Sequence, residues 1–177
     1  MRACNYAIFF LDGARIVFTP GNHWSGRGIL DRNKALWGSW LVIGSKGSKF
    51  WFGGDTGYSD VFKQIGKKYG PIDLSAIPIG AYNPRPTMKF VHVDPEEAIK
   101  IHYDLKSKVS FGIHWATFKL TLEHYMEPKE RIARMVDENT GMAPFLVPNI
   151  GETVQGENRF FAEDKTSATA ETQILSE

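Results

Sequence analysis

Short β-rich runs recur along this sequence, and the turn residues between them limit the folds that it can adopt. Residues 6–11 and 15–19 are two such runs, separated by an Asp-Gly pair that is typical of a tight hairpin. Residues 36–43 and 49–52 form a second pair across a turn that contains glycine and serine. The first third of the chain is therefore predicted to consist of antiparallel strands.

Helices are predicted to alternate with strands in the rest of the chain. The clearest helix start is Asp94, an N-cap residue followed by Pro95 at the first helical position and Glu97 at the third. Residues 60–69 and 128–138 are the other predicted helices. Further strands are predicted at 74–79, 108–113 and 145–147, and a long loop at 81–93. This alternation favours a mixed sheet layered with helices.

Composition limits the classes of protein that fit. The 177 residues are 42% hydrophobic and 23% charged, which is typical of a packed globular chain. The net charge of +1 gives no argument for nucleic-acid binding. Cys4 is the only cysteine, so no disulfide can form within the chain, and no apolar run approaches the ~20 residues of a membrane helix. We expect an intracellular protein, either cytoplasmic or peripherally bound to a membrane.

Three polar residues share one situation, because each lies in a loop just after a predicted strand. They are His23, Asp55 and His114. A sheet can bring such strand ends together, and imidazole and carboxylate are suitable zinc ligands. A hydrogen-bonded structural histidine, or an Asx turn or helix N-cap at Asp55, is the simpler explanation of each residue taken by itself. Spacing alone leaves these alternatives open.

Five blocks in one order resemble a known family. The segment Gly54-Asp55-Thr56-Gly57-Tyr58, with the His23 and His114 segments, resembles the later metal motifs of the metallo-β-lactamase fold. The match from about residue 15 to about residue 128 resembles, more closely, N-acyl-phosphatidylethanolamine-hydrolysing phospholipase D. The blocks that carry it are Phe18-Thr19-Pro20-Gly21-Asn22-His23-Trp24, Leu36-Trp37-Gly38-Ser39-Trp40, Ala76-Ile77-Pro78-Ile79-Gly80-Ala81-Tyr82, His92-Val93-Asp94-Pro95-Glu96-Glu97-Ala98 and Ile113-His114-Trp115.

The resemblance implies a metal role for three residues. Asp55 matches a carboxylate that bridges two zinc ions, His23 matches a ligand to one ion, and His114 matches a ligand to the other. Two ions held roughly 3.5–4 Å apart can polarise one phosphate together. The implied reaction hydrolyses N-acyl-phosphatidylethanolamine to N-acylethanolamine and phosphatidic acid.

Other residues near these motifs receive weaker assignments. His92 matches a family position near the metals and is predicted to act as a catalytic residue that supports the substrate phosphate or a leaving oxygen, with a surface loop histidine as the alternative. Tyr82 and Arg85 are candidate substrate-binding residues, because both could reach a phosphate. His102 and His124 are expected to be structural.

Four tryptophans flank these candidate residues in the sequence. Trp37 and Trp40 are predicted to lie in the core. Trp24 and Trp115 could either line a groove for acyl chains or belong to the core.

One expected motif is missing. Members of this fold carry an earlier His-x-His-x-Asp-His motif that supplies most of the zinc ligands. The five histidines here are His23, His92, His102, His114 and His124, and no two are two positions apart. Each zinc would have one imidazole and a shared carboxylate, whereas catalytic zinc normally has three protein ligands.

The missing motif also shapes the expected architecture. The predicted class is α+β, and residues 1–154 are expected to form roughly the second half of an αββα metallo-β-lactamase-like sandwich. Residues 155–177 are expected to be a polar, disordered tail. Without the other sheet, apolar faces and strand edges would be exposed to water. We therefore expect this chain either to fold poorly alone or to need a partner that supplies the missing half.

Three hypotheses about function follow. The first is a fragment of a zinc phospholipase whose substrate is a phospholipid at a peripheral membrane surface. The second is a non-catalytic truncated form that binds another chain, including a homodimer. The third is a generic metallo-β-lactamase-fold phosphodiesterase. The motifs at residues 79–82 and 92–98 disfavour the third hypothesis, because the metallo-β-lactamase fold in general does not require them.

Overall fold

The structure, a computed structural model, describes residues 7–154. The predicted tail at 155–177 lies outside the described residues. The chain forms strands β1 (Ala7–Leu11), β2 (Ala14–Pro20), β3 (Gly38–Ile43), β4 (Lys49–Phe52), β5 (Ile72–Pro78), β6 (Ser107–Ile113) and β7 (Phe145–Leu146), and helices α1 (Val61–Tyr69), α2 (Arg85–Met88), α3 (Pro95–Asp104) and α4 (Glu127–Glu138).

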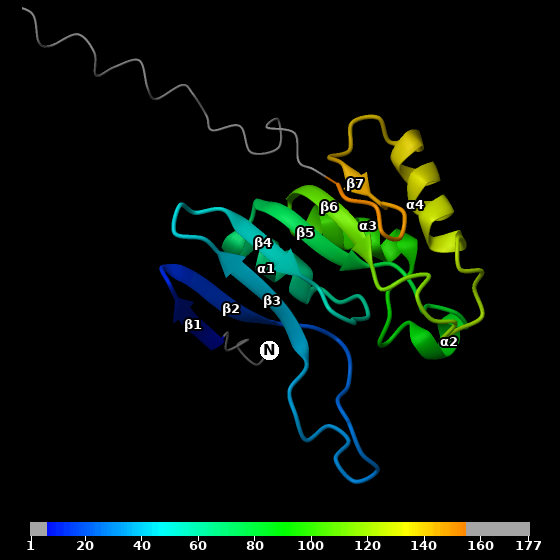
Figure 1. The fold of residues 1–177 in the computed structure, drawn as a ribbon, viewed down its shortest axis with the longest axis horizontal. Coiled ribbons are helices and arrows are strands. Elements are labelled where there is room, and N and C mark those ends of the chain that lie inside the picture. Colours follow the sequence, from blue (N-terminus) through cyan, green and yellow to red (C-terminus); the bar gives the residue numbers. More distant parts are fainter. Residues whose placement is uncertain (1–6, 155–177) are drawn as a thin grey trace, which may run out of the picture.

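The strands form one mixed sheet in which spatial order follows chain order, from β1 to β7 (Figure 1). Strands β1 to β4 are antiparallel neighbours, and β4 to β7 are parallel neighbours. The predicted hairpin is confirmed: Asp12 and Gly13 both have positive φ, at 47° and 80°, as a tight turn of this kind requires. Each parallel pair is joined through a helix, as parallel connections need.

Helices cover one face of the sheet. On that face Val17, Leu41 and Trp51 are fully buried, and the Trp51 ring meets the Phe62 ring of α1 edge-on at 5.8 Å. Helix α3 packs against α1, α4 and strands β5 and β6. The hydrophobic core therefore lies between the sheet and this single helical layer.

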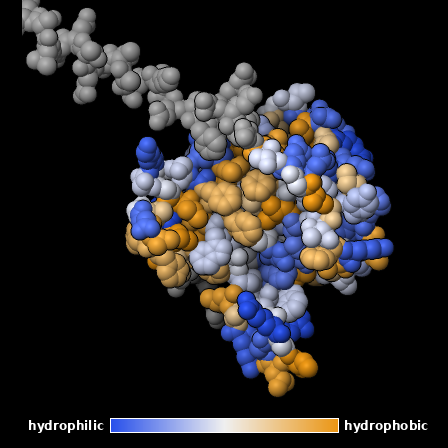
Figure 2. Space-filling view, viewed as in Figure 1, coloured by the Kyte–Doolittle hydropathy of each residue, from blue (hydrophilic) through white to orange (hydrophobic). Residues whose placement is uncertain are grey.

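The opposite face carries apolar side chains that the described residues leave partly uncovered. Phe9, Trp40 and Phe52 are 54%, 40% and 43% exposed. The Trp40 ring centroid lies 4.8 Å from that of Phe18 and 6.4 Å from that of Phe9, so these rings contact one another along the surface of the sheet. Figure 2 shows hydrophobic residues gathered over the strands on this side. We call this surface the open face.

The open face corrects one sequence prediction and agrees with another. The prediction that Trp40 and Trp37 are core residues is wrong within the described chain, because Trp40 is exposed and Trp37 is only half-buried. Alternation along β3 turns Leu41 into the core and Trp40 to the other side. The expectation of an uncovered apolar face agrees with the structure.

The helix starts follow the sequence signals closely. The Asp94 side chain accepts a hydrogen bond from the backbone N–H of Glu97 at 2.8 Å, which makes Asp94 the N-cap of α3 as predicted. The segment 81–93 is not a continuous loop, because α2 forms one helical turn inside it. Among the described residues, no helix is long and apolar enough to cross a bilayer.

Candidate metal centre

The three predicted ligands converge at one edge of the sheet. Strands β2, β4 and β6 run in the same direction, so their last residues meet at that edge. His23, Asp55 and His114 lie in the loops that follow these strands. His23 Nε2 lies 4.0 Å from Asp55 Oδ2, and His114 Nε2 lies 3.3 Å from Asp55 Oδ1. Each carboxylate oxygen therefore faces a different imidazole.

The His23 ring has a defined orientation. Its Nδ1 lies 2.9 Å from the backbone carbonyl oxygen of Trp24, and a carbonyl can only accept, so Nδ1 carries the hydrogen. In the neutral ring Nε2 then holds a lone pair, and it is buried without a hydrogen-bond partner. A lone pair and a carboxylate oxygen that face each other suit a cation between them. Metal-binding histidines commonly donate their other N–H to a carbonyl in this way.

His92 completes the cluster between the other two histidines. Its ring centroid lies 5.3 Å from that of His23 and 5.2 Å from that of His114, and it stacks on the latter at 16°. Burial, with the neighbouring charge of His114, lowers the pKa of His92 to about 4, so the ring is neutral at pH 7. The Nδ1 atoms of both His92 and His114 are buried without hydrogen-bond partners.

Thr56 is the residue that holds these loops together. Its Oγ1 accepts from the backbone N–H of Asn22 at 2.8 Å, and its carbonyl oxygen accepts from the backbone N–H of Val93 at 2.9 Å. Thr56 is fully buried, and its contacts fix Asn22, which precedes His23, and Val93, which follows His92. The sequence analysis missed this role. The only signal was the position of Thr56 next to Asp55.

His114 is positioned by an unusual backbone. Its φ of 58° lies in the left-handed region, which histidine tolerates better than branched residues do. The strand before it pairs with the end of β5, where the Ile79 N–H donates to the Ile113 carbonyl. A Cβ at Gly80 would lie 2.4 Å from the His114 carbonyl oxygen, so the close approach of these two loops needs glycine.

Tyr82 and Arg85 contact other protein groups. The Tyr82 hydroxyl is buried and donates to Glu127 at 2.7 Å. The Arg85 guanidinium pairs with Asp94 at 3.1 Å and with Glu97 at 2.7 Å. These contacts hold α2 against α3 and the 80s loop against α4. Binding of substrate by either residue stays a prediction.

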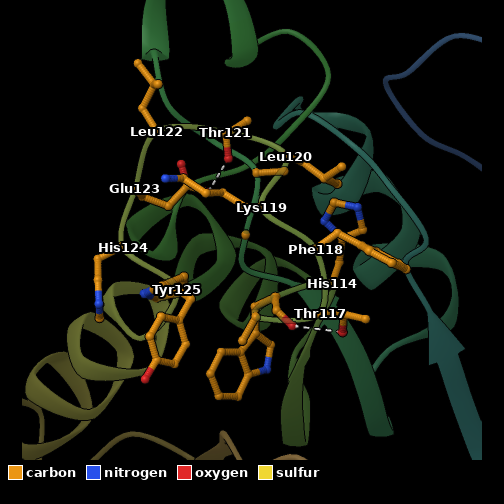
Figure 3. Close-up of a pocket in the computed structure, with 15 residues that line it drawn as sticks. His114, Thr117, Phe118, Lys119, Leu120, Thr121, Leu122, Glu123, His124 and Tyr125 are labelled. Carbon is orange, nitrogen blue, oxygen red and sulfur yellow. Dashed lines mark hydrogen bonds between the residues drawn. The ribbon is translucent and has the colours of Figure 1, made fainter.

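Two cavities flank the histidine cluster. One, of about 630 Å³, is lined by His23 and Asp55 together with the loop between β2 and β3. The other, of about 650 Å³, is lined by His114 and the segment 115–125. Figure 3 shows His114 and Phe118 on one side of this second cavity and Glu123, His124 and Tyr125 on the other. Both cavities thus connect the cluster to exposed loops.

His102 and His124 lie in different environments. His102 is buried, with Nδ1 2.7 Å from the Ser110 hydroxyl. Its position between α3 and β6 agrees with the predicted structural role. His124 is exposed and lines the second cavity.

The cluster fits part of a binuclear centre. Asp55 offers one oxygen to each side, and His23 and His114 each offer one nitrogen, so two ions would each receive two protein donors. Among residues 7–154, no group of three or more His, Cys, Asp or Glu side chains is arranged to hold an ion. The orphaned Nε2 of His23 fits a metal, but the donor count falls short of the three protein ligands of catalytic zinc.

Comparison with known proteins confirms the resemblance seen in the sequence. Residues 6–115 match the family described as Beta-lactamase superfamily domain. The chain is 43% identical over 144 residues to N-acyl-phosphatidylethanolamine-hydrolyzing phospholipase D 1 of Caenorhabditis elegans, covering 79% of this chain and 40% of that protein. It is 37% identical over 140 residues to the mitochondrial protein of the same activity name from Saccharomyces cerevisiae, covering 78% and 30%. The chain thus spans less than half the length of either relative.

Solved structures support the same fold. Igni18, described as a metallo hydrolase of the archaeon Ignicoccus hospitalis, superposes with a TM-score of 0.63 at 25% identity. The superposition covers 85% of this chain and 58% of Igni18. The one-sheet architecture described above therefore corresponds to part of a larger fold.

Proposed function

This chain belongs to the beta-lactamase superfamily, and from that premise we propose that it forms one half of a zinc-dependent phospholipase D acting on N-acyl-phosphatidylethanolamine. The observation that carries the proposal is the pair of imidazole nitrogens facing the two oxygens of Asp55. Relatives named for this reaction share 43% and 37% of the aligned residues, which favours the same substrate class.

His23, Asp55 and His114 would hold the metal ions in this proposal. Two bound zinc ions would polarise the phosphodiester and lower the pKa of water. Asp55 would supply its carboxylate to the metal site, and the carbonyl of Trp24 would keep the His23 ring in the ligating tautomer.

His92 is proposed to act on the substrate. It lies within the cluster, between His23 and His114, and its ring is neutral. A neutral imidazole can donate one hydrogen bond to a phosphoryl oxygen or to the leaving oxygen. The release of phosphatidic acid and N-acylethanolamine is the outcome expected for phospholipase D chemistry.

The remaining ligands are proposed to come from a segment that would cover the open face. Each ion lacks at least one protein donor among the described residues, and the sequence holds no His-x-His-x-Asp-His motif. The exposed aromatic side chains on the open face are what a second sheet would bury. Completion of the metal site and of the core would then occur together.

The test is complementation in trans. The 177-residue chain would be purified alone and after co-expression with the part of the Caenorhabditis relative that it does not match. Zinc content is measured by mass spectrometry, and lipid products by chromatography. We expect no turnover from the chain alone, and zinc with both products after complementation.

A matched variant and two outcomes decide this proposal. In the complemented protein, Asp55→Asn should lower zinc content and turnover by at least about 100-fold, because losing a group that only hydrogen-bonds to a metal ligand already costs about 10–100-fold. Stoichiometric zinc and turnover from the chain alone would refute the ligand shortage. Diacylglycerol as a product would refute phospholipase D chemistry.

A second candidate function rests on the open face. The chain could act without catalysis by binding another chain through this apolar surface, as a homodimer or with a relative. Sedimentation velocity separates the two. A stable dimer that shows no zinc and no gain on complementation would favour the binding function.

A further inference from the structure

The loop between β2 and β3 projects away from the rest of the molecule (Figure 1). Its tip carries Ile29 and Leu30, whose exposed fractions are 99% and 84%. Figure 2 shows hydrophobic residues at the end of this protrusion and hydrophilic residues directly beside them. Single exposed apolar residues are common on protein surfaces, but two adjacent ones at the end of a protruding loop need an explanation.

Hydrogen bonds within the loop hold this tip in place. Ser25 and Ala35 close the base of the loop, where the Ser25 hydroxyl donates to the Ala35 carbonyl at 2.6 Å. Nearer the tip, the Asp31 carboxylate accepts from the backbone N–H groups of Arg27 and Gly28, the latter at 2.7 Å. The loop is therefore structured although its apolar residues contribute nothing to the core.

Positive charge surrounds the tip. Arg27, Arg32 and Lys34 lie in the loop, and Asp31 is its only acidic residue between positions 21 and 37. The guanidinium of Arg32 lies 5.4 Å from the centre of the Trp24 ring, which supports it beside the base of the loop. An apolar tip with a basic surround is complementary to a bilayer that has hydrocarbon inside and anionic phosphates outside.

The loop also leads to the histidine cluster. The cavity of about 630 Å³ is lined by His23 and Asp55 and also by Arg27 and Lys34. A phosphate held by these basic side chains would lie in the same cavity as the proposed metal ligands. Docking of the loop would therefore bring lipid headgroups close to the site.

We propose that the loop between β2 and β3 docks this protein on an anionic lipid bilayer. Ile29 and Leu30 enter the interfacial region, and Arg27, Arg32 and Lys34 contact lipid phosphates. The proposal rests on the proposed function for its purpose, since a phospholipid substrate resides in a bilayer. Its test requires neither metal nor turnover.

The first experiment places a reporter on the tip. Leu30→Cys is made with Cys4→Ser, labelled with an environment-sensitive fluorophore and mixed with phosphatidylcholine–phosphatidylserine vesicles. Ile150→Cys, at a position 73% exposed elsewhere on the molecule, is the matched control. We expect a blue shift for the tip and none for the control. No shift at the tip, or an equal shift at both positions, would overturn the proposal.

The second experiment measures vesicle binding by co-sedimentation. Ile29→Asp combined with Leu30→Asp should lower the partition coefficient by at least tenfold, because each buried aliphatic side chain contributes about that factor. Arg27→Gln and Lys34→Gln should each lower binding to phosphatidylserine vesicles about fivefold, and less in high salt. Circular dichroism checks that the variants fold.

The open face provides the competing explanation and the last control. If Trp40→Ser abolished vesicle binding while the tip variants bound like wild type, the open face would be the lipid-binding surface and the loop proposal would fail. If the complemented protein hydrolyses the lipid and its tip variants still bind vesicles like wild type, the loop proposal is refuted and the proposed function stands. Binding through the tip without hydrolysis by the complemented wild type would refute the proposed function alone.

Discussion

The two faces of the sheet are built from similar residues but have opposite environments. On the helical side, Trp51 is fully buried against Phe62, whereas on the open face Trp40 remains 40% exposed beside Phe18. Both tryptophans belong to neighbouring strands, so strand propensity does not separate them. The difference lies in which face has helices to cover it. The open face is therefore the surface that the proposed second sheet would cover, and within residues 7–154 the histidine cluster also offers fewer donors than catalytic zinc normally has.

The largest expected loss of stability comes from a substitution on the face of the sheet that the helices cover. Trp51→Ala should lower the free energy of unfolding by about 3–5 kcal/mol, because it removes a buried ring and leaves a cavity. The Trp51 indole also donates to the Thr19 hydroxyl at 3.2 Å, which the variant loses. Urea unfolding followed by circular dichroism measures the change. A loss below 1 kcal/mol, by the same cavity argument, would show that this face is not the core.

Sequence reasoning predicted the strands well and the faces incompletely. Turn residues and caps act locally, so the Asp12–Gly13 hairpin and the Asp94 cap could be recognised directly. Trp40 could not be assigned in the same way, because its exposure depends on which face of the sheet the described helices cover, and that is set by the tertiary structure. The family resemblance identified His23, Asp55 and His114 as candidate ligands, but no local sequence pattern indicates the distances between their side chains.

Thr56 illustrates what sequence reasoning leaves out at the site. Its importance comes from hydrogen bonds to residues 34 positions before it and far beyond it along the chain. Such long-range contacts have no sequence spacing by which they could be recognised. The structure was needed to show that one buried residue orients two loops of the cluster, one through its side chain and one through its backbone carbonyl.

A pH-dependent loss of stability is expected from His102, which is buried between α3 and β6. Burial lowers the pKa of His102 to about 4 from its ordinary 6.5, so the folded state prefers the neutral ring. Because the folded pKa lies below the unfolded one, the stabilisation is complete above about pH 6.5 and is lost as the pH falls towards 4. The total loss is about 3 kcal/mol. Urea unfolding at a series of pH values measures it.

The His102 prediction needs a variant because His92 also has a lowered pKa. His102→Gln removes the titrating ring, so its free energy of unfolding should depend less steeply on pH than that of wild type between pH 6.5 and 4. Parallel curves for the two proteins would contradict the assignment to His102. A His92→Gln chain reports the contribution of the other ring.

A smaller loss of stability is expected at the edge of the sheet that carries the histidine cluster. Thr56→Val should destabilise the chain by about 1–3 kcal/mol, because the backbone N–H of Asn22 loses its acceptor and the Gly57 carbonyl loses the buried hydrogen bond that the Thr56 hydroxyl donates. Thr56→Ser keeps the hydroxyl and should stay close to wild type. Hydrogen exchange of the Asn22 amide, followed by NMR, should accelerate in the valine variant only. Unchanged exchange would refute the positioning role.

The smallest expected effect on stability is on the open face. Trp40→Ala removes a ring that is already partly in water, so the cost should be about 1 kcal/mol, close to the value of its aromatic contacts with Phe18 and Phe9. The same substitution in the complemented protein should cost more, because a second layer would bury the ring. Urea unfolding of both forms gives the two values. If Trp40→Ala cost the same in the chain alone and in the complemented protein, the open face would not be the surface on which the second half packs.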